Sequence, residues 1–192
     1  MFFLRRPSTQ RVNRFRRTVE PDTFSYAEVG ATVAGDIPKD YNVDHNHICL
    51  GKGLSLFERA YAALEDWKMF DLGWVELIHP ADPVAPGQTV LVLAHTFGLY
   101  SLSASRIIAM IDENDGQTRR RGFSYGTLLH HVERGEERFS VEYHREDDSV
   151  WYDLLAFSNP QHRLAILGYP LARAAQRRFA TDSKAAMLRA VS

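Results

Sequence analysis

The chain has 192 residues, of which 45% are hydrophobic and 24% charged, and its formal net charge is −1. This is the composition of a globular domain with a sizeable core, and the small net charge argues against nucleic acid as a partner. A single cysteine, Cys49, excludes an internal disulfide, and no window approaches the ~18 consecutive apolar residues of a transmembrane segment. We therefore expect a soluble, cytoplasmic protein.

The first predicted element is a short amphipathic helix that follows Ser8, a suitable N-cap residue. Its apolar face consists of Val12, Phe15 and Val19. Arginines cover the remainder, so two interpretations stay open: a docked helix with a solvated basic face, or an arm that binds phosphate or anionic lipid. We accordingly divide the chain into an N-terminal basic helical arm, residues 1–23, and a main domain, residues 24–192.

Residues 24–42 carry no regular pattern, and Val43–Leu50 is the first predicted strand. Gly51-Lys52-Gly53 then leads into a helix over Leu54–Met69, whose apolar residues recur at the three-and-four spacing. Glycines before a helix can hold a phosphate, but the full P-loop spacing is missing, so we interpret the segment as a turn.

From Trp74 the apolar period changes to two, which is typical of strands. The predicted strands are Trp74–His79, Thr89–Phe97, Ser105–Ile111, Arg121–His131, Arg138–Arg145 and Val150–Phe157. Short turns join them, including a charged hairpin over Glu133–Glu137, so neighbouring strands should pair antiparallel. A helix is predicted over Leu164–Val191, with an interruption at Gly168-Tyr169-Pro170.

These elements predict an α+β fold in which a curved antiparallel sheet of about six to seven strands grips a long C-terminal helix. A sheet with one apolar face must be covered, and the terminal helix is the available cover. This layout resembles the helix-grip arrangement of the START and birch-pollen-allergen superfamily.

Motifs spread over nearly the whole chain also form a recognisable set. They are Phe24-Ser-Tyr-Ala-Glu-Val-Gly-Ala-Thr, Leu50-Gly-Lys-Gly, Phe123-Ser-Tyr-Gly-Thr-Leu, Gly135-Glu-Glu-Arg-Phe, Val150-Trp-Tyr, Phe157-Ser-Asn-Pro and Pro170-Leu-Ala-Arg-Ala-Ala-Gln-Arg-Arg. The set resembles the uncharacterised domain-of-unknown-function family numbered nineteen-ninety. The resemblance implies a helix-grip fold and brings no catalytic residues with it. One departure is Leu129-His130-His131, where the family pattern leads us to expect a proline-glycine turn.

Two motifs have a chemical interpretation that we do not favour. Gly122-Phe-Ser124-Tyr-Gly126 matches the G-x-S-x-G of hydrolases, which needs a strand-to-helix turn, whereas here the strand pattern continues. His45 and His47 lie on one side of a strand and could bind a metal together with Asp153, but no further ligand has diagnostic spacing. We predict no metal and no cofactor.

A cluster of titratable residues surrounds the predicted hairpin. It consists of His130, His131, Glu136, Glu137 and Arg138. A histidine beside a carboxylate can supply acid–base chemistry near neutral pH. However, the alternation of Arg138 with Phe139 places these charges outward, which favours a salt-bridged or solvated surface.

Polar residues inside otherwise apolar strands are better pocket candidates, because a few polar groups orient a ligand in an apolar pocket. The predicted ligand site consists of His95, Tyr125, Trp151, Asp153, Leu154 and Phe179.

The leading hypothesis is therefore a protein that binds a small hydrophobic or lipid-like molecule between the sheet and the C-terminal helix. One alternative is an enzyme that uses His95, Tyr125 or Asp153 for acid–base chemistry in the same cavity. Another is an interaction protein that uses the basic N-terminal helix. The sequence carries no signal for an oligomeric state.

Overall fold

The computed structural model describes residues 1–78, 83–162 and 168–192. Within these ranges the strands form one antiparallel sheet in the order β2-β8-β7-β6-β5-β4-β3, with the short β1 beside β5. The strands are β1 (Phe2–Phe3), β2 (Asn42–Lys52), β3 (Val75–Ile78), β4 (Thr89–Thr96), β5 (Leu99–Asn114), β6 (Thr118–Thr127), β7 (Glu133–His144) and β8 (Ser149–Pro160). The helices are α1 (Thr9–Val19), α2 (Ala31–Ala34), α3 (Leu54–Glu65), the 3₁₀ turn η1 (Lys68–Phe70) and α5 (Tyr169–Val191).

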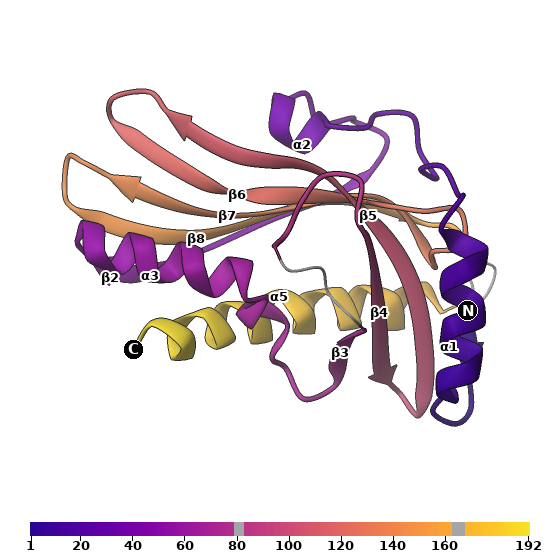
Figure 1. The fold of residues 1–192 in the computed structure, drawn as a ribbon. Coiled ribbons are helices and arrows are strands. Elements are labelled where there is room, and N and C mark those ends of the chain that lie inside the picture. The colour runs from indigo at the N-terminus through magenta and orange to yellow at the C-terminus, as the bar shows by residue number, and fades with distance from the viewer. Residues whose placement is uncertain (79–82, 163–167) are drawn as a thin grey trace.

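The sheet curves over α5, and α3 lies on the same, concave side, whereas α2 lies on the opposite side (Figure 1). Each strand from β4 to β8 pairs antiparallel with the strand before it, and β2 closes the order by pairing with β8. The predicted α+β fold with an antiparallel sheet around a C-terminal helix is confirmed.

The main core lies between the concave face, α3, η1 and α5. Its fully buried aromatic residues include Phe57 of α3, Phe123 of β6 and Tyr152 of β8. Several side-chain bonds fix α5 to the rest of the chain. Among them, the hydroxyls of Tyr152 and Ser183 are 2.8 Å apart, and Trp74 Nε1 donates to Asp182 Oδ2 at 2.8 Å. The C-terminal helix is thus attached both to β8 and to Trp74, the residue before β3.

Helix α1 packs on the outer face of β4 and β5, where it closes a second core. The apolar residues of that core are Val12, Phe15, Val19, Leu91, Leu93, Leu102, Ala104 and Leu128. Ser8 is the N-cap, and its Oγ accepts a hydrogen bond from the backbone N–H of Arg11 at 3.4 Å. The predicted helix and its cap are confirmed, and residues 1–23 lie against the sheet.

Some predicted boundaries were wrong. The segment Glu133–Glu137 belongs to β7, and the chain reverses over residues 128–132 instead. Strand β5 begins at Leu99, because Phe97 and Gly98 both take positive φ (51° and 76°) and make a two-residue hairpin turn. Helix α3 ends at Glu65, since Trp67 has a left-handed φ of 58°.

At the C-terminus, α5 begins at Tyr169 with Pro170 in its first turn, so this segment starts the helix and does not interrupt it. The predicted helical residues 164–167, and His79 of the predicted strand Trp74–His79, lie outside the described residues. No helix within the described ranges is long and apolar enough to cross a membrane.

Candidate functional site

A pocket of about 420 Å³ lies between the concave face of the sheet and α5. Its apolar wall includes Phe70, Trp74, Val92, Leu154, Phe179 and Ala180. A polar group of residues lines it as well: Asp44, Asn46, Tyr125, His131, Glu133, Glu137 and Gln176. The combination of an apolar wall with a few polar groups is typical of small-molecule sites.

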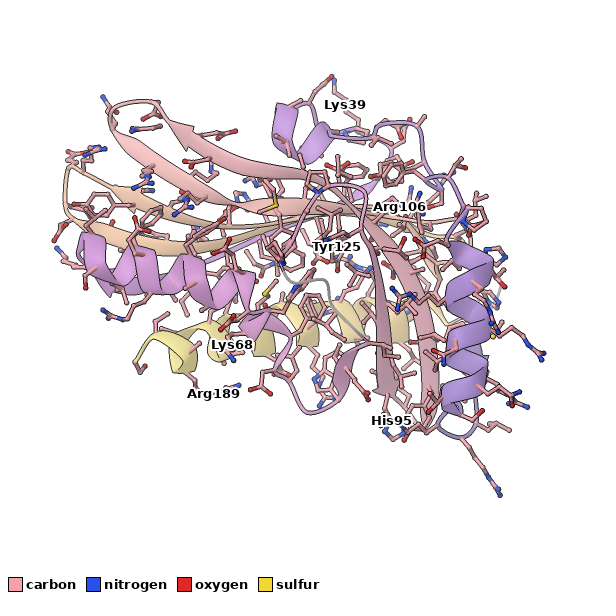
Figure 2. The ribbon with its side chains drawn as sticks, viewed as in Figure 1. Lys39, Lys68, His95, Arg106, Tyr125 and Arg189 are labelled. Carbon is pink, nitrogen blue, oxygen red and sulfur yellow. The ribbon has the colours of Figure 1, made fainter. Side chains whose placement is uncertain are left out.

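Strands β6 and β7 place Tyr125 directly opposite Glu137 in the sheet. Side chains alternate along a strand, so Tyr125 shares the concave face with Phe123, and Glu137 shares it with Phe139. The Tyr125 hydroxyl donates a hydrogen bond to Glu137 Oε2 at 2.7 Å. Figure 2 shows Tyr125 between the sheet and α5.

The environment of Glu137 favours its neutral form. Burial raises the pKa of the Glu137 carboxyl to about 7, the Tyr125 hydrogen bond lowers it, and the nearby carboxylates of Glu133 and Asp44 raise it further. Burial also raises the pKa of the Tyr125 hydroxyl well above its ordinary value of 10.0. Glu137 is surrounded by protein, yet part of its surface is accessible from the pocket that it lines. The site therefore holds a carboxyl group that changes charge near neutral pH.

A second acidic group lies on the same wall. The side-chain amide of Gln176, on α5, donates to both carboxylate oxygens of Glu133, each at 2.7 Å. Burial raises the pKa of the Glu133 carboxyl, and burial lowers the pKa of the neighbouring His131 to about 4. His131 is therefore neutral at physiological pH and contributes no positive charge.

Three of the six predicted ligand-site residues line the pocket, namely Tyr125, Leu154 and Phe179. The other three lie on the opposite, convex face. His95 is exposed near the end of β4, far from Tyr125 (Figure 2), and stacks on Tyr100 at a centroid distance of 4.2 Å. Trp151 lies beside His47, with ring centroids 5.3 Å apart. Since Trp151 and Leu154 are three residues apart on one strand, alternation places them on opposite faces.

Asp153 belongs to a buried ionic network on the convex face. Its Oδ1 accepts from Arg138 Nη2 at 2.8 Å, and its Oδ2 is bonded to His45 Nε2. Arg138 also donates to the backbone carbonyl of Thr32 at 2.8 Å. The guanidinium group thus supplies the positive charge for Asp153. Among the described residues, no cluster of three or more His, Cys, Asp or Glu side chains could hold a metal ion.

Glu136 and Arg138 were expected on a salt-bridged or solvated surface; Arg138 is salt-bridged, to Asp153, but neither side chain is solvated. Both side chains point away from the concave face, but they are 3% and 8% exposed because the segment of residues 24–42 covers them. Glu136 accepts hydrogen bonds from the Tyr26 hydroxyl at 2.8 Å, from the backbone N–H of Gly30 at 2.7 Å and from both the backbone and the hydroxyl of Thr32. All the acceptor capacity of this carboxylate is used to dock the segment.

The G-x-S-x-G motif lies in the middle of β6, so no strand-to-helix turn exposes Ser124, which is fully buried. Its glycines instead allow neighbouring groups to approach the β6 backbone closely. A Cβ at Gly126 would lie 2.1 Å from the Tyr26 hydroxyl oxygen, and one at Gly122 would lie 2.1 Å from the Phe139 carbonyl oxygen. The motif is a packing feature of the curved sheet, as expected.

Glu137, Glu133 and Gln176 line the pocket but were not among the predicted site residues. One signal pointed to Glu137: it precedes Phe139 by two residues and Val141 by four, so it shares their face once the strand is extended to include it. Placing a turn at Glu133–Glu137 hid that relationship.

The model of the family described as "Domain of unknown function (DUF1990)" matches residues 25–186. A UPF0548 protein of Dictyostelium discoideum is 37% identical over 100% of this chain and 96% of its own length. A UPF0548 protein of Deinococcus radiodurans is 36% identical over 99% of this chain and 98% of its own length.

Two solved structures share the general arrangement at low identity. One is a conserved protein from Geobacillus kaustophilus, with TM-score 0.49 and 8% identity over 78% of this chain and 95% of that chain. The other is Ara h 8.0201, with TM-score 0.47 and 11% identity over 79% of this chain and 97% of that chain. At these scores and identities the likeness says nothing of what this chain binds.

Proposed function

Because the chain belongs to the DUF1990 family, whose description names no activity, we propose a function from the pocket itself: the protein binds a small, largely apolar molecule between the sheet and α5. The observation that carries the proposal is the lining of the 420 Å³ pocket, in which aromatic and aliphatic side chains surround a small polar group. A volume of this order accommodates a small organic molecule, for which such pockets typically span roughly 300–1,000 Å³.

The rim of the pocket supports the same function. Phe97 and Leu171 both line the pocket and are 61% and 52% exposed. Large apolar side chains left in water at a pocket edge favour entry of an apolar molecule, which would cover them.

The experiment is a fluorescence titration with the neutral probe N-phenyl-1-naphthylamine, using the full chain and two variants of α5. Ala175 lines the pocket and its neighbour Ala174 does not. A phenyl ring at Ala175 would occupy part of the pocket, so Ala175→Phe should weaken probe binding about tenfold or more, whereas Ala174→Phe should not. Absence of saturable binding, or equal binding by both variants, would remove the proposal. Native mass spectrometry of the freshly purified chain tests it independently, through a co-purifying molecule.

A second candidate function is acid–base catalysis on a molecule in the same pocket, and it is favoured by the Tyr125–Glu137 pair. A carboxyl with a pKa of about 7 that lines a pocket is suited to act as a general base at neutral pH. In that case Glu137→Gln would abolish turnover of a bound molecule and leave its binding in place. The sequence pointed to His95, Tyr125 or Asp153 for this chemistry, and of these His95 and Asp153 lie on the other face of the sheet.

A further inference from the structure

The charged side chains that face the pocket are of one sign. Among the described residues that line it there are four acidic residues and neither lysine nor arginine. Three of these carboxylates, those of Asp44, Glu133 and Glu137, stand on the pocket side of their strands, whereas Glu136 is bonded on the convex face.

The negative charges of these three carboxylates are balanced to different extents by ion pairs and hydrogen bonds. Asp44 is paired with Arg173, whose Nη2 lies 2.7 Å from Asp44 Oδ1. Glu133 accepts two hydrogen bonds from the Gln176 amide. Glu137, by contrast, accepts a single hydrogen bond, from Tyr125, and no cation among the described residues forms an ion pair with it.

A carboxylate in this position is costly for the empty protein. Removal of a charge from water is unfavourable unless an opposite charge or several hydrogen bonds replace the lost hydration. One Glu137 oxygen is bonded by Tyr125 and the other has no hydrogen-bond donor among the described residues, although the side chain is open to the pocket. A ligand that brings a positive charge would supply the missing partner, whereas a ligand that brings a carboxylate would add a repulsive charge.

We propose that the pocket selects amphiphiles with a positively charged nitrogen, which lies beside Glu137 while the apolar body packs against Phe70 and Phe179. This inference rests on the ligand-binding function proposed above and specifies the chemical class of the ligand. Phe70 and Phe179 contact each other, with ring centroids 5.1 Å apart, on the apolar wall of the same pocket.

The affinity for such a cation should depend on pH, because Glu137 attracts it only when ionised. The pKa of about 7 at Glu137 predicts that the affinity rises between pH 6 and pH 8, while an alkylamine stays protonated well above this range. The titratable groups around this site are Tyr125 from β6, His131 from the turn before β7, Glu133 from β7, Asp44 from β2 and Tyr152 from β8. Arg173 of α5 lies outside the pocket lining and is paired with Asp44. Of the titratable groups, Glu133 also ionises as pH rises, and its negative charge further increases the affinity for a cation.

The test is isothermal titration calorimetry of the full chain at pH 8 with decylamine, decanol and decanoate, each below its micelle concentration. The three probes share one alkyl chain and differ in the charge of the head group. Decylamine should bind about tenfold tighter than decanol, and decanoate should bind weakest. Glu137→Gln should remove the advantage of decylamine, so that decylamine and decanol bind with about equal affinity. The matched control is Glu146→Gln, at an exposed acidic residue outside the pocket lining, and it should change none of the three affinities.

The outcomes separate the two proposals. If decanoate binds as tightly as decylamine, or if Glu137→Gln keeps the preference for decylamine, the charge selectivity is wrong while binding of apolar molecules stands. If none of the three probes binds and N-phenyl-1-naphthylamine fails as well, both proposals are wrong. The order of the three affinities in the unmodified chain is informative even if a variant fails to fold.

Discussion

Tyr125 and Glu137 face each other across β6 and β7, and the tyrosine hydroxyl is the one hydrogen-bond donor that reaches the glutamate among the described residues, at 2.7 Å. This pair connects the fold of the sheet with the function that we propose for the pocket. Its position follows from strand register, and its chemistry follows from burial of a carboxyl group with little compensation.

The first prediction concerns the stability of Glu137→Gln. Folding raises the pKa of this carboxyl from its ordinary value of 4.5 to about 7, so its protonated form stabilises the folded state below pH 4.5 and that contribution is lost as pH rises through 7. Glutamine cannot ionise, so the variant should be more stable than the unmodified chain at pH 8 by up to about 3 kcal/mol, and nearly equal at pH 4.5. Urea unfolding at the two pH values measures the difference. Destabilisation of the variant at pH 8 would contradict the assigned environment.

The second prediction concerns Tyr125→Phe. The hydroxyl stabilises the ionised Glu137, so its removal should raise the pKa of that carboxyl above about 7. Consequently the pH midpoint of decylamine binding should move upward in this variant. The titration can be followed directly by ¹³C NMR of the labelled glutamate carboxyl. An unchanged midpoint would show that the hydrogen bond does not govern ionisation.

Local patterns predicted the elements of this fold well, because the strands and helices bury one face each. The period-two stretch at Thr89–Phe97 became β4, and the arrangement of Val12, Phe15 and Val19 became the buried face of α1. Ser8 was recognisable as an N-cap, since the cap is formed within four residues of sequence.

The faces of the strands were not predictable from β8 alone. Its sequence is apolar on both sides: Tyr152 and Leu154 face the main core, while Phe157 packs with Tyr26 on the other side. A strand covered on both faces loses the polar–apolar alternation that identifies the buried side. Trp151 and Asp153, two residues of the predicted ligand site, therefore fell on the convex face.

The charged segment of β7 was misplaced for a related reason. Glu136 and Arg138 are bonded to Thr32, more than 100 residues away in the sequence. Bonding partners so distant in the sequence cannot be recognised from the residues around Glu136 and Arg138. The charged residues of this segment therefore resembled those of an exposed turn.

The third prediction concerns the buried ion pair between Arg138 and Asp153, whose side chains are 10% and 6% exposed. Asp153→Ala leaves the guanidinium group without its carboxylate partner and should lower the free energy of unfolding by about 3–5 kcal/mol. The control is Glu76→Ala, which breaks the exposed pair with Arg6 and should cost less than about 1 kcal/mol. Urea unfolding at pH 7 compares the two. A loss of less than 1 kcal/mol for Asp153→Ala would mean that water or a neighbour replaces the carboxylate.

The last prediction asks whether residues 1–23 behave as an arm or as part of the domain. Phe15 is 4% exposed and packs in the second core with residues of β4 and β5, whereas Arg14 beside it is exposed. Removal of a buried phenyl ring costs about 3–5 kcal/mol, so Phe15→Ala should lower the unfolding midpoint of the whole chain in a single transition. Arg14→Ala should change the free energy of unfolding by less than about 0.5 kcal/mol. If both variants melt like the unmodified chain, the N-terminal helix contributes nothing to folding, and a separate role of its arginines in partner binding gains support. A cooperative loss of stability for Phe15→Ala alone would instead show that the helix folds together with the outer face of the sheet. Only a helix packed on the sheet can change the stability of the whole chain when that ring is removed.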